Sequence, residues 1–329
     1  VYGLLEAGIA LSALAVPLLL MGARAIYASA LGGLPSPPDA AAVGQPVFYL
    51  LVAFVVLAIP TSFMGATLPL LIRYAVRTDR EVGPRVALLY ATNTGGAVFG
   101  TLFAAFILLP RLGLNGTVWV GVAVNGLVFV IAALLAKRAS GFTSRESAAL
   151  AASPTGFVET CVRPLITGTR SRRERLGVVF NSQPGWILPL ILISGAVSFI
   201  YEVLWTRMLA HVMGGSIYAF ATMLAAFLTG IALGGGLAGK LAVNRERATM
   251  AFALAQVSIA LFSASVYTWM VPLIPEELTT YRLAVYAALV MLPATIFIGA
   301  TLPLAVRILT KDETEATVST ARIYSWNTI

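Results

Sequence analysis

The chain has 329 residues, of which 59% are hydrophobic and 11% are charged, and its formal net charge is +8. Its mean hydropathy of +0.89 excludes an ordinary soluble domain. The single cysteine, Cys161, excludes a disulfide framework, and it cannot form a zinc site with the single histidine, His211. The composition therefore indicates a protein whose main partner is the lipid bilayer.

Apolar stretches of about twenty residues, long enough to cross roughly 30 Å of hydrocarbon, recur along the chain. Because the lipid interior cannot hydrogen-bond to the backbone, each stretch is expected to be a helix. Eight spans are predicted, at residues 2–22, 47–71, 86–110, 116–136, 187–210, 217–238, 249–273 and 283–306. The predicted fold class is thus an all-α polytopic membrane protein with eight transmembrane helices.

The basic residues indicate which side of the membrane each connection occupies. Eighteen of the 22 Lys and Arg residues follow an even-numbered span, including Arg73, Lys137, Lys240 and Arg307, which lie at or just beyond its end. Lys and Arg are enriched in cytoplasmic loops, so we predict a multi-pass protein of the cell membrane. The connections after helices 2, 4, 6 and 8 are then cytoplasmic. The positive charge is explained by this topology, and no nucleic-acid partner is expected.

One long polar segment, residues 139–186, divides the chain. It carries the basic cluster Arg170–Arg175 and is interpreted as a flexible cytoplasmic linker. Residues 1–138 then form the end of a first membrane half with four helices. Residues 187–329 form the start of a second half, with four helices and the start of a fifth. The basic cluster either grips anionic lipid head groups or only fixes the topology.

The chain contains one motif twice. Gly65–Leu70 (GATLPL) returns as Gly299–Leu304, 234 positions later. The match continues at the same offset, pairing Thr61, Phe63, Arg73, Tyr90, Asn93 and Thr94 with Thr295, Phe297, Arg307, Tyr324, Asn327 and Thr328. The second span therefore matches the eighth, six helices later, in the same orientation. A parallel repeat of six-helix units is the plan of the major facilitator superfamily, and it implies two further helices on each side of this chain.

The fifth span carries the candidate site for chemistry. Its polar residues recur every four positions and form one stripe: Ser194, Ser198, Glu202 and Thr206. Glu202 lies roughly 20 Å along this helix, within the hydrocarbon, where a carboxyl group is costly and should face the bundle interior. Glu202 is interpreted either as a proton or cation site, with Ser198 nearby, or as a structural clamp with Arg207 or Tyr201. The second intramembrane acid, Glu6, is expected to make only a packing hydrogen bond.

Other polar and small residues are assigned to helix shape and packing. Pro69 and Pro303 interrupt the hydrogen bonds of their helices and favour kinks, with Gly65 and Gly299 adding freedom. Glycines four residues apart let helices approach closely, as at Gly96 and Gly100, Gly230 and Gly234, and Gly235 and Gly239. Asn93 is suited to interhelical hydrogen bonding.

Residues 194–242, the two GATLPL copies and the Tyr-x-x-Asn-Thr element together resemble a known family. It is the membrane region of fused major-facilitator/spermidine-synthase-like proteins, in which the element at Ile200–Trp205 opens a unit. The resemblance implies a membrane domain that handles or transports a polyamine-type cation, with a soluble aminopropyltransferase-like domain following it in the same protein. This chain itself offers no catalytic, cofactor or metal site. The alternatives are a stand-alone secondary transporter of unknown substrate and a non-transporting anchor for a synthase domain.

Overall fold

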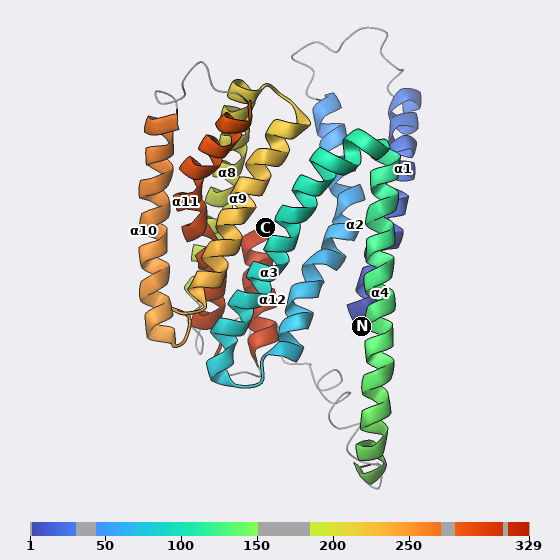
Figure 1. The fold of residues 1–329 in the computed structure, drawn as a ribbon, viewed down its shortest axis with the longest axis vertical. Coiled ribbons are helices and arrows are strands. Elements are labelled where there is room, and N and C mark those ends of the chain that lie inside the picture. The colour runs from blue at the N-terminus through green and yellow to red at the C-terminus, as the bar shows by residue number, and fades with distance from the viewer. Residues whose placement is uncertain (1, 31–43, 151–184, 271–279, 312–314, 329) are drawn as a thin grey trace. The chain divides into compact units, whose positions relative to one another are not determined.

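The computed structural model describes residues 2–30, 44–150, 185–270, 280–311 and 315–328, and these residues are almost entirely helical (Figure 1). The α-helices are α1 (Tyr2–Ala30), α2 (Gly44–Ala75), α3 (Val82–Phe103), α4 (Leu109–Leu150), α8 (Ile187–Met213), α9 (Ile217–Ala238), α10 (Arg245–Met270), α11 (Thr280–Leu309) and α12 (Ala316–Thr328). A 3-10 turn, η1 (Asp79–Glu81), precedes α3, and a π-helical turn, η2 (Ala104–Leu108), follows it. The predicted all-α class is confirmed for the described part of the chain.

Seven helical segments in the described residues are long and apolar enough to cross a membrane. One of them, Asp79–Lys137, has 59 residues, which at about 1.5 Å per residue is roughly three times the thickness of the hydrocarbon. Its backbone is not helical at Gly113, where φ is 66° and ψ is −173°. This glycine therefore separates two spans, and each of the eight predicted spans corresponds to a helical stretch of the structure.

The fourth span continues further than predicted. Helix α4 ends at Leu150, so the first twelve residues of the predicted linker, 139–150, are helical. The rest of the predicted linker up to residue 184, with the Arg170–Arg175 cluster, lies outside the described residues.

The chain divides into two compact units that do not coincide with the two halves predicted from sequence. Unit 1 comprises Val1–Thr67 and Leu114–Glu174, and unit 2 comprises Leu68–Gly113 and Arg175–Ile329. Helix α3, from the first predicted half, thus belongs to the same unit as α8–α12. Within unit 1, a Cβ at Gly8 of α1 would lie 3.2 Å from the ring of Phe63 on α2, and one at Gly3 would lie 3.3 Å from the ring of Phe129 on α4.

Helix α9 is the centre of unit 2, with α11 on one side and α3 on the other (Figure 1). A side chain at Gly230 or Gly234 of α9 would overlap Thr295 or Ile296 of α11, and one at Gly299 of α11 would overlap the backbone of Ile231. On the opposite face of α9, a Cβ at Gly235 would lie 2.8 Å from the ring of Tyr90 on α3. Small residues therefore allow α9 to contact both neighbours at backbone distance.

The two copies of the repeated motif make the same local hydrogen bonds. Three pairs of threonines donate to carbonyls of their own helices at the same spacing: Thr61 to Leu57 and Thr295 to Met291, Thr67 to Met64 and Thr301 to Ile298, and Thr94 to Tyr90 and Thr328 to Tyr324. Phe63 packs on α1, and its counterpart Phe297 stacks on Phe262 of α10 at 5.7 Å. Helices α2 and α11 continue through Pro69 and Pro303. The larger six-helix repeat and the kinks stay predictions.

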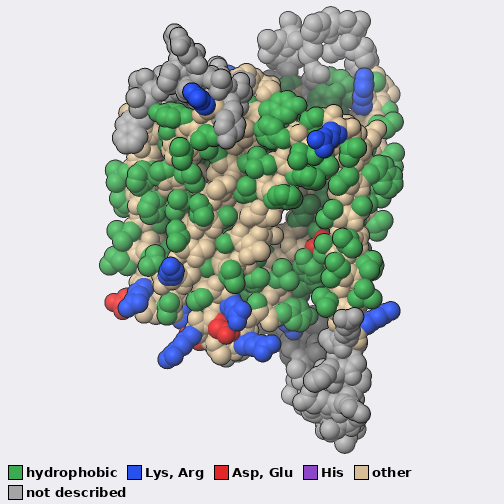
Figure 2. All heavy atoms as spheres, in the orientation of Figure 1, with side chains coloured by type: hydrophobic (Ala, Val, Ile, Leu, Met, Phe, Trp, Pro, Cys, Tyr) green, Lys and Arg blue, Asp and Glu red, His purple; other side chains and the backbone are tan. Residues whose placement is uncertain are grey.

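Basic side chains gather at one end of unit 2, and Figure 2 shows several Lys and Arg along the lower edge of that unit, below a band of hydrophobic side chains, with fewer near the upper edge. Arg245, at the start of α10, donates to the carbonyl of Thr310 beyond the end of α11. Arg307 of α11 is buried, with 7% of its surface exposed, and binds Asp79 of η1 through two parallel bonds of 2.9 and 3.0 Å. These contacts bring the connections after α2, α9 and α11 to the same end of the unit.

Replacing Gly234 by alanine should destabilise the protein by about 1–3 kcal/mol, because the added methyl overlaps the backbone of α11. Gly96→Ala is the matched control, since a Cβ there has no atom of the described structure within 4 Å and alanine favours helix. Thermal unfolding of each purified variant in detergent measures the difference. Equal stabilities of the two variants would contradict the packing described for α9 and α11.

The Arg307–Asp79 pair should respond asymmetrically to mutation. Asp79→Ala leaves a buried guanidinium without its partner and should cost about 3 kcal/mol. Arg307→Met should cost less, because the Asp79 side chain is 44% exposed and water can solvate it. Arg85→Ala, which breaks an exposed pair with Glu81 at 3.8 Å, should change stability by less than about 1 kcal/mol. Chemical or thermal denaturation of the three variants tests this order.

Candidate functional site in the interior of unit 2

The polar stripe of α8 is hydrogen-bonded at every residue except Glu202. Ser198 donates to the carbonyl of Ser194 at 2.8 Å, and Thr206 donates to the carbonyl of Glu202 at 2.7 Å. The Ser194 hydroxyl accepts a bond of 3.0 Å from Gln256 of α10. The half-buried carboxyl group of Glu202, in contrast, has no hydrogen bond or ion pair with any residue that the structure describes.

Glu202 lines a cavity of about 90 Å³ inside unit 2. Five helices contribute to its wall, and the polar side chains among its lining residues are Tyr90 of α3, Ser198 and Glu202 of α8, Thr301 of α11 and Asn327 of α12. Apolar side chains of α9 and α11 complete it. The cavity therefore combines one acidic group with four uncharged polar groups in an otherwise apolar bundle.

Gly195 of α8 sets one wall of this cavity. A Cβ at Gly195 would overlap the backbone carbonyl of Asn327, so only a glycine lets α12 approach α8 at this point. Tyr90 reaches the cavity from α3 in a similar way, with its ring packed against Gly235 of α9. Close helix approach at two glycines thus brings Asn327 and Tyr90 to the same cavity as Glu202.

Two of the four predicted site residues, Glu202 and Ser198, lie together at the cavity. Tyr201 instead stacks on the buried ring of Trp205, with ring centroids 5.5 Å apart. Arg207 is exposed and makes no ion pair with Glu202. Five residues along a helix correspond to a rotation of about 140° away from the starting side chain, so Arg207 leaves α8 on a different face. The expected clamp of Glu202 with Arg207 or Tyr201 is therefore not present in the described structure.

The other intramembrane acid differs from Glu202. Glu6 of α1 is buried, with 8% of its surface exposed, and it shares a hydrogen bond with the Tyr2 hydroxyl one turn earlier. The Glu6 carboxyl group thus has a partner within its own helix. Glu202 is thus the intramembrane acid, among the described residues, whose carboxyl group faces a cavity without such a partner.

The repeat contains Tyr90, Thr301 and Asn327, and the sequence pattern does not predict these three as site residues. Tyr90 comes from the first copy of the Tyr-x-x-Asn-Thr element and Asn327 from the second. The first-copy asparagine, Asn93, is exposed and makes no hydrogen bond in the described structure. The signal that pointed toward the cavity was the recurrence of polar residues in apolar helices, and only the packing shows which copies reach Glu202.

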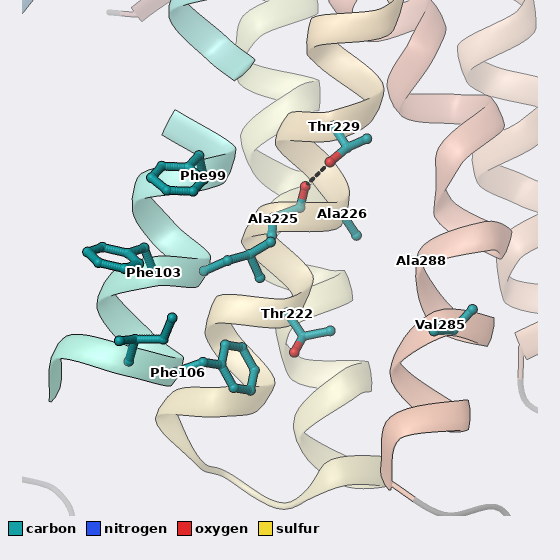
Figure 3. A pocket seen from close by; sticks show the side chains of 11 residues that line it. Phe99, Phe103, Phe106, Thr222, Ala225, Ala226, Thr229, Val285 and Ala288 are labelled. Atoms are coloured by element: carbon teal, nitrogen blue, oxygen red, sulfur yellow. Dashed lines mark hydrogen bonds between the residues drawn. The ribbon is translucent and has the colours of Figure 1, made fainter. Parts of the chain in front are cut away.

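A second, larger cavity of about 710 Å³ lies between α3, α9 and α11 (Figure 3). The rings of Phe99, Phe103 and Phe106 line one wall, and small residues of α9 such as Ala225 and Thr222 line another. The hydroxyl of Thr229, also in the lining, donates to the Ala225 carbonyl at 2.7 Å. No ionisable side chain lines this cavity, so it offers no carboxylate that would neutralise a cation.

Comparison of the chain with family models, with curated proteins and with solved structures finds no match.

Proposed function

We propose that this chain is the membrane domain of a transporter-like protein. In this protein Glu202 binds a proton or cation as it crosses the helix bundle. The observation that supports this most is the position of Glu202, which lines a cavity of unit 2 with no hydrogen-bond or ion-pair partner among the described residues. The motif resemblance extends the proposal to the membrane region of fused major-facilitator/spermidine-synthase-like proteins. The transported species would then be a polyamine-type cation.

The energetics of the carboxyl group favour a transient partner. A carboxylate within the membrane is costly, and proteins that keep one for structure usually pair it permanently. Glu202 has no permanent partner in the described structure, and the hydroxyls around it cannot neutralise its charge. A proton or a cation that arrives and leaves would satisfy the group, and such exchange is what transport requires.

The size of the cavity bears on the substrate. Sites for small organic molecules usually measure about 300–1,000 Å³, whereas this cavity measures about 90 Å³. A polyamine would therefore need the helices around Glu202 to move apart, as they do in the rocking motion by which transporters of this plan expose a central site. The present arrangement corresponds, in this proposal, to a closed state of the Glu202 site.

The basic residues give unit 2 an orientation in the membrane. By the positive-inside rule, the basic end of unit 2 faces the cytoplasm, and the apolar band above it lies in the bilayer. A synthase-like domain following the membrane region of the same protein is the expected further partner. In this arrangement the membrane domain would pass a cationic product across the membrane.

Glu202→Gln should lower spermidine uptake by the full-length protein in proteoliposomes at least about tenfold, because glutamine keeps the shape of the side chain but removes its charge. Glu246→Gln is the control, since Glu246 is an exposed acid at the start of α10. Unchanged uptake by the Glu202 variant would remove Glu202 from the transport pathway. No uptake of spermidine or another cation by the wild type would support the anchor instead.

A further inference from the structure

We propose that the Glu202 cavity is a binding site for a sodium ion, held by oxygen atoms of Glu202, Ser198, Thr301 and Asn327. This inference rests on the proposed function and names the ion that the Glu202 site takes. The four side chains come from three helices, α8, α11 and α12, and they all line the same cavity.

The serine and threonine hydroxyls of the cavity are set to accept rather than to donate. Ser198 donates its hydrogen to the carbonyl of Ser194 at 2.8 Å, and Thr301 donates its hydrogen to the carbonyl of Ile298 at 2.7 Å. Each hydroxyl has one hydrogen only, so its remaining capacity is two lone pairs. These oxygens can therefore bind a positively charged ligand and cannot stabilise an anion.

The charge of the lining matches a monovalent ion. Glu202 is the carboxyl group of the cavity, and no Lys or Arg lines it. Calcium sites usually combine several carboxylates, and magnesium keeps most of its own water molecules. The described residues contain no cluster of three or more His, Cys, Asp or Glu side chains. One carboxylate with neutral oxygens thus balances one positive charge, which matches an alkali ion better than a divalent ion.

The volume of the cavity is large enough for an ion that has lost most of its hydration shell. A water molecule takes up about 30 Å³ in the liquid, so 90 Å³ accommodates roughly three particles of that size. A sodium ion with one or two water molecules fits this space. A polyamine chain does not fit it in the present arrangement.

The site is complete only while α12 is packed against α8. Asn327 reaches the cavity because its backbone lies against Gly195, and Thr301 reaches it from α11. An ion that binds oxygen atoms of all three helices stabilises the arrangement in which they are together. Sodium binding and the closed state of the site are therefore coupled.

The test measures the thermal stability of the purified full-length protein in NaCl, with choline chloride replacing it at constant ionic strength. Sodium should raise the unfolding temperature saturably. Glu202→Gln and Thr301→Val should each raise the half-saturating sodium concentration at least tenfold. Thr229→Val is the matched control, because the Thr229 hydroxyl makes the same kind of bond to its own helix but lines the other cavity. This control should respond to sodium as the wild type does.

Three results would overturn the sodium site. The first is a sodium effect of equal size in wild type and Glu202→Gln, which places the ion elsewhere. The second is stabilisation by acid pH alone that Glu202→Gln abolishes, which makes Glu202 a proton site. The third is stabilisation by spermidine or methylammonium but not by sodium, which makes it an ammonium site. Spermidine uptake that depends on Glu202 but not on sodium would retain the proposed function and reject only the ion.

Discussion

The close packing of α9 against α3 and α11 is the constraint on which the rest of unit 2 depends. Gly234, Gly235 and Gly299 have no side chains. The backbones of α9 and α11 therefore come within van der Waals distance of each other, and the ring of Tyr90 packs directly on α9. In a bilayer the solvent is as apolar as the side chains, so such close contact replaces the hydrophobic effect as the force that holds helices together. The same approach brings Tyr90 of α3 to the cavity of Glu202.

The cavity shows how a polar site is kept in an apolar bundle. Two of the polar groups around it, the hydroxyls of Ser198 and Thr301, donate to carbonyls of their own helices. These bonds remove the cost of burying the hydroxyls and at the same time fix the direction in which their lone pairs point. Glu202 is the acidic group of the cavity and makes no such bond, so the charge of the cavity is concentrated at one carboxyl group.

The spans could be predicted from sequence because a single apolar segment in a bilayer satisfies its own backbone hydrogen bonds only as a helix. An apolar stretch of about twenty residues, twice the length that a membrane strand needs, therefore indicates a helix. The site was predicted in part for a similar reason. The four-residue spacing of Ser198 and Glu202 fixes a common face of α8, whereas the five-residue spacing to Arg207 does not.

Glycine spacing was less informative, because Gly96 and Gly100 show the same pattern as Gly230 and Gly234 yet meet no neighbour in the described structure. Which glycines touch a helix, and which copy of a repeated asparagine reaches a cavity, depends on tertiary packing that no single helix encodes.

The chain passes between the two units at two described points, and both are places where the backbone is weakly restrained. One lies between Thr67 and Leu68 inside the repeated motif, next to Pro69, which has no amide hydrogen to bond the preceding turn. The other lies at Gly113, whose φ of 66° few other residues adopt. The elastic resistance to bending is lowest where a helix lacks a hydrogen bond or a residue lacks a side chain. Bending of the chain between the two units would therefore collect at these two points.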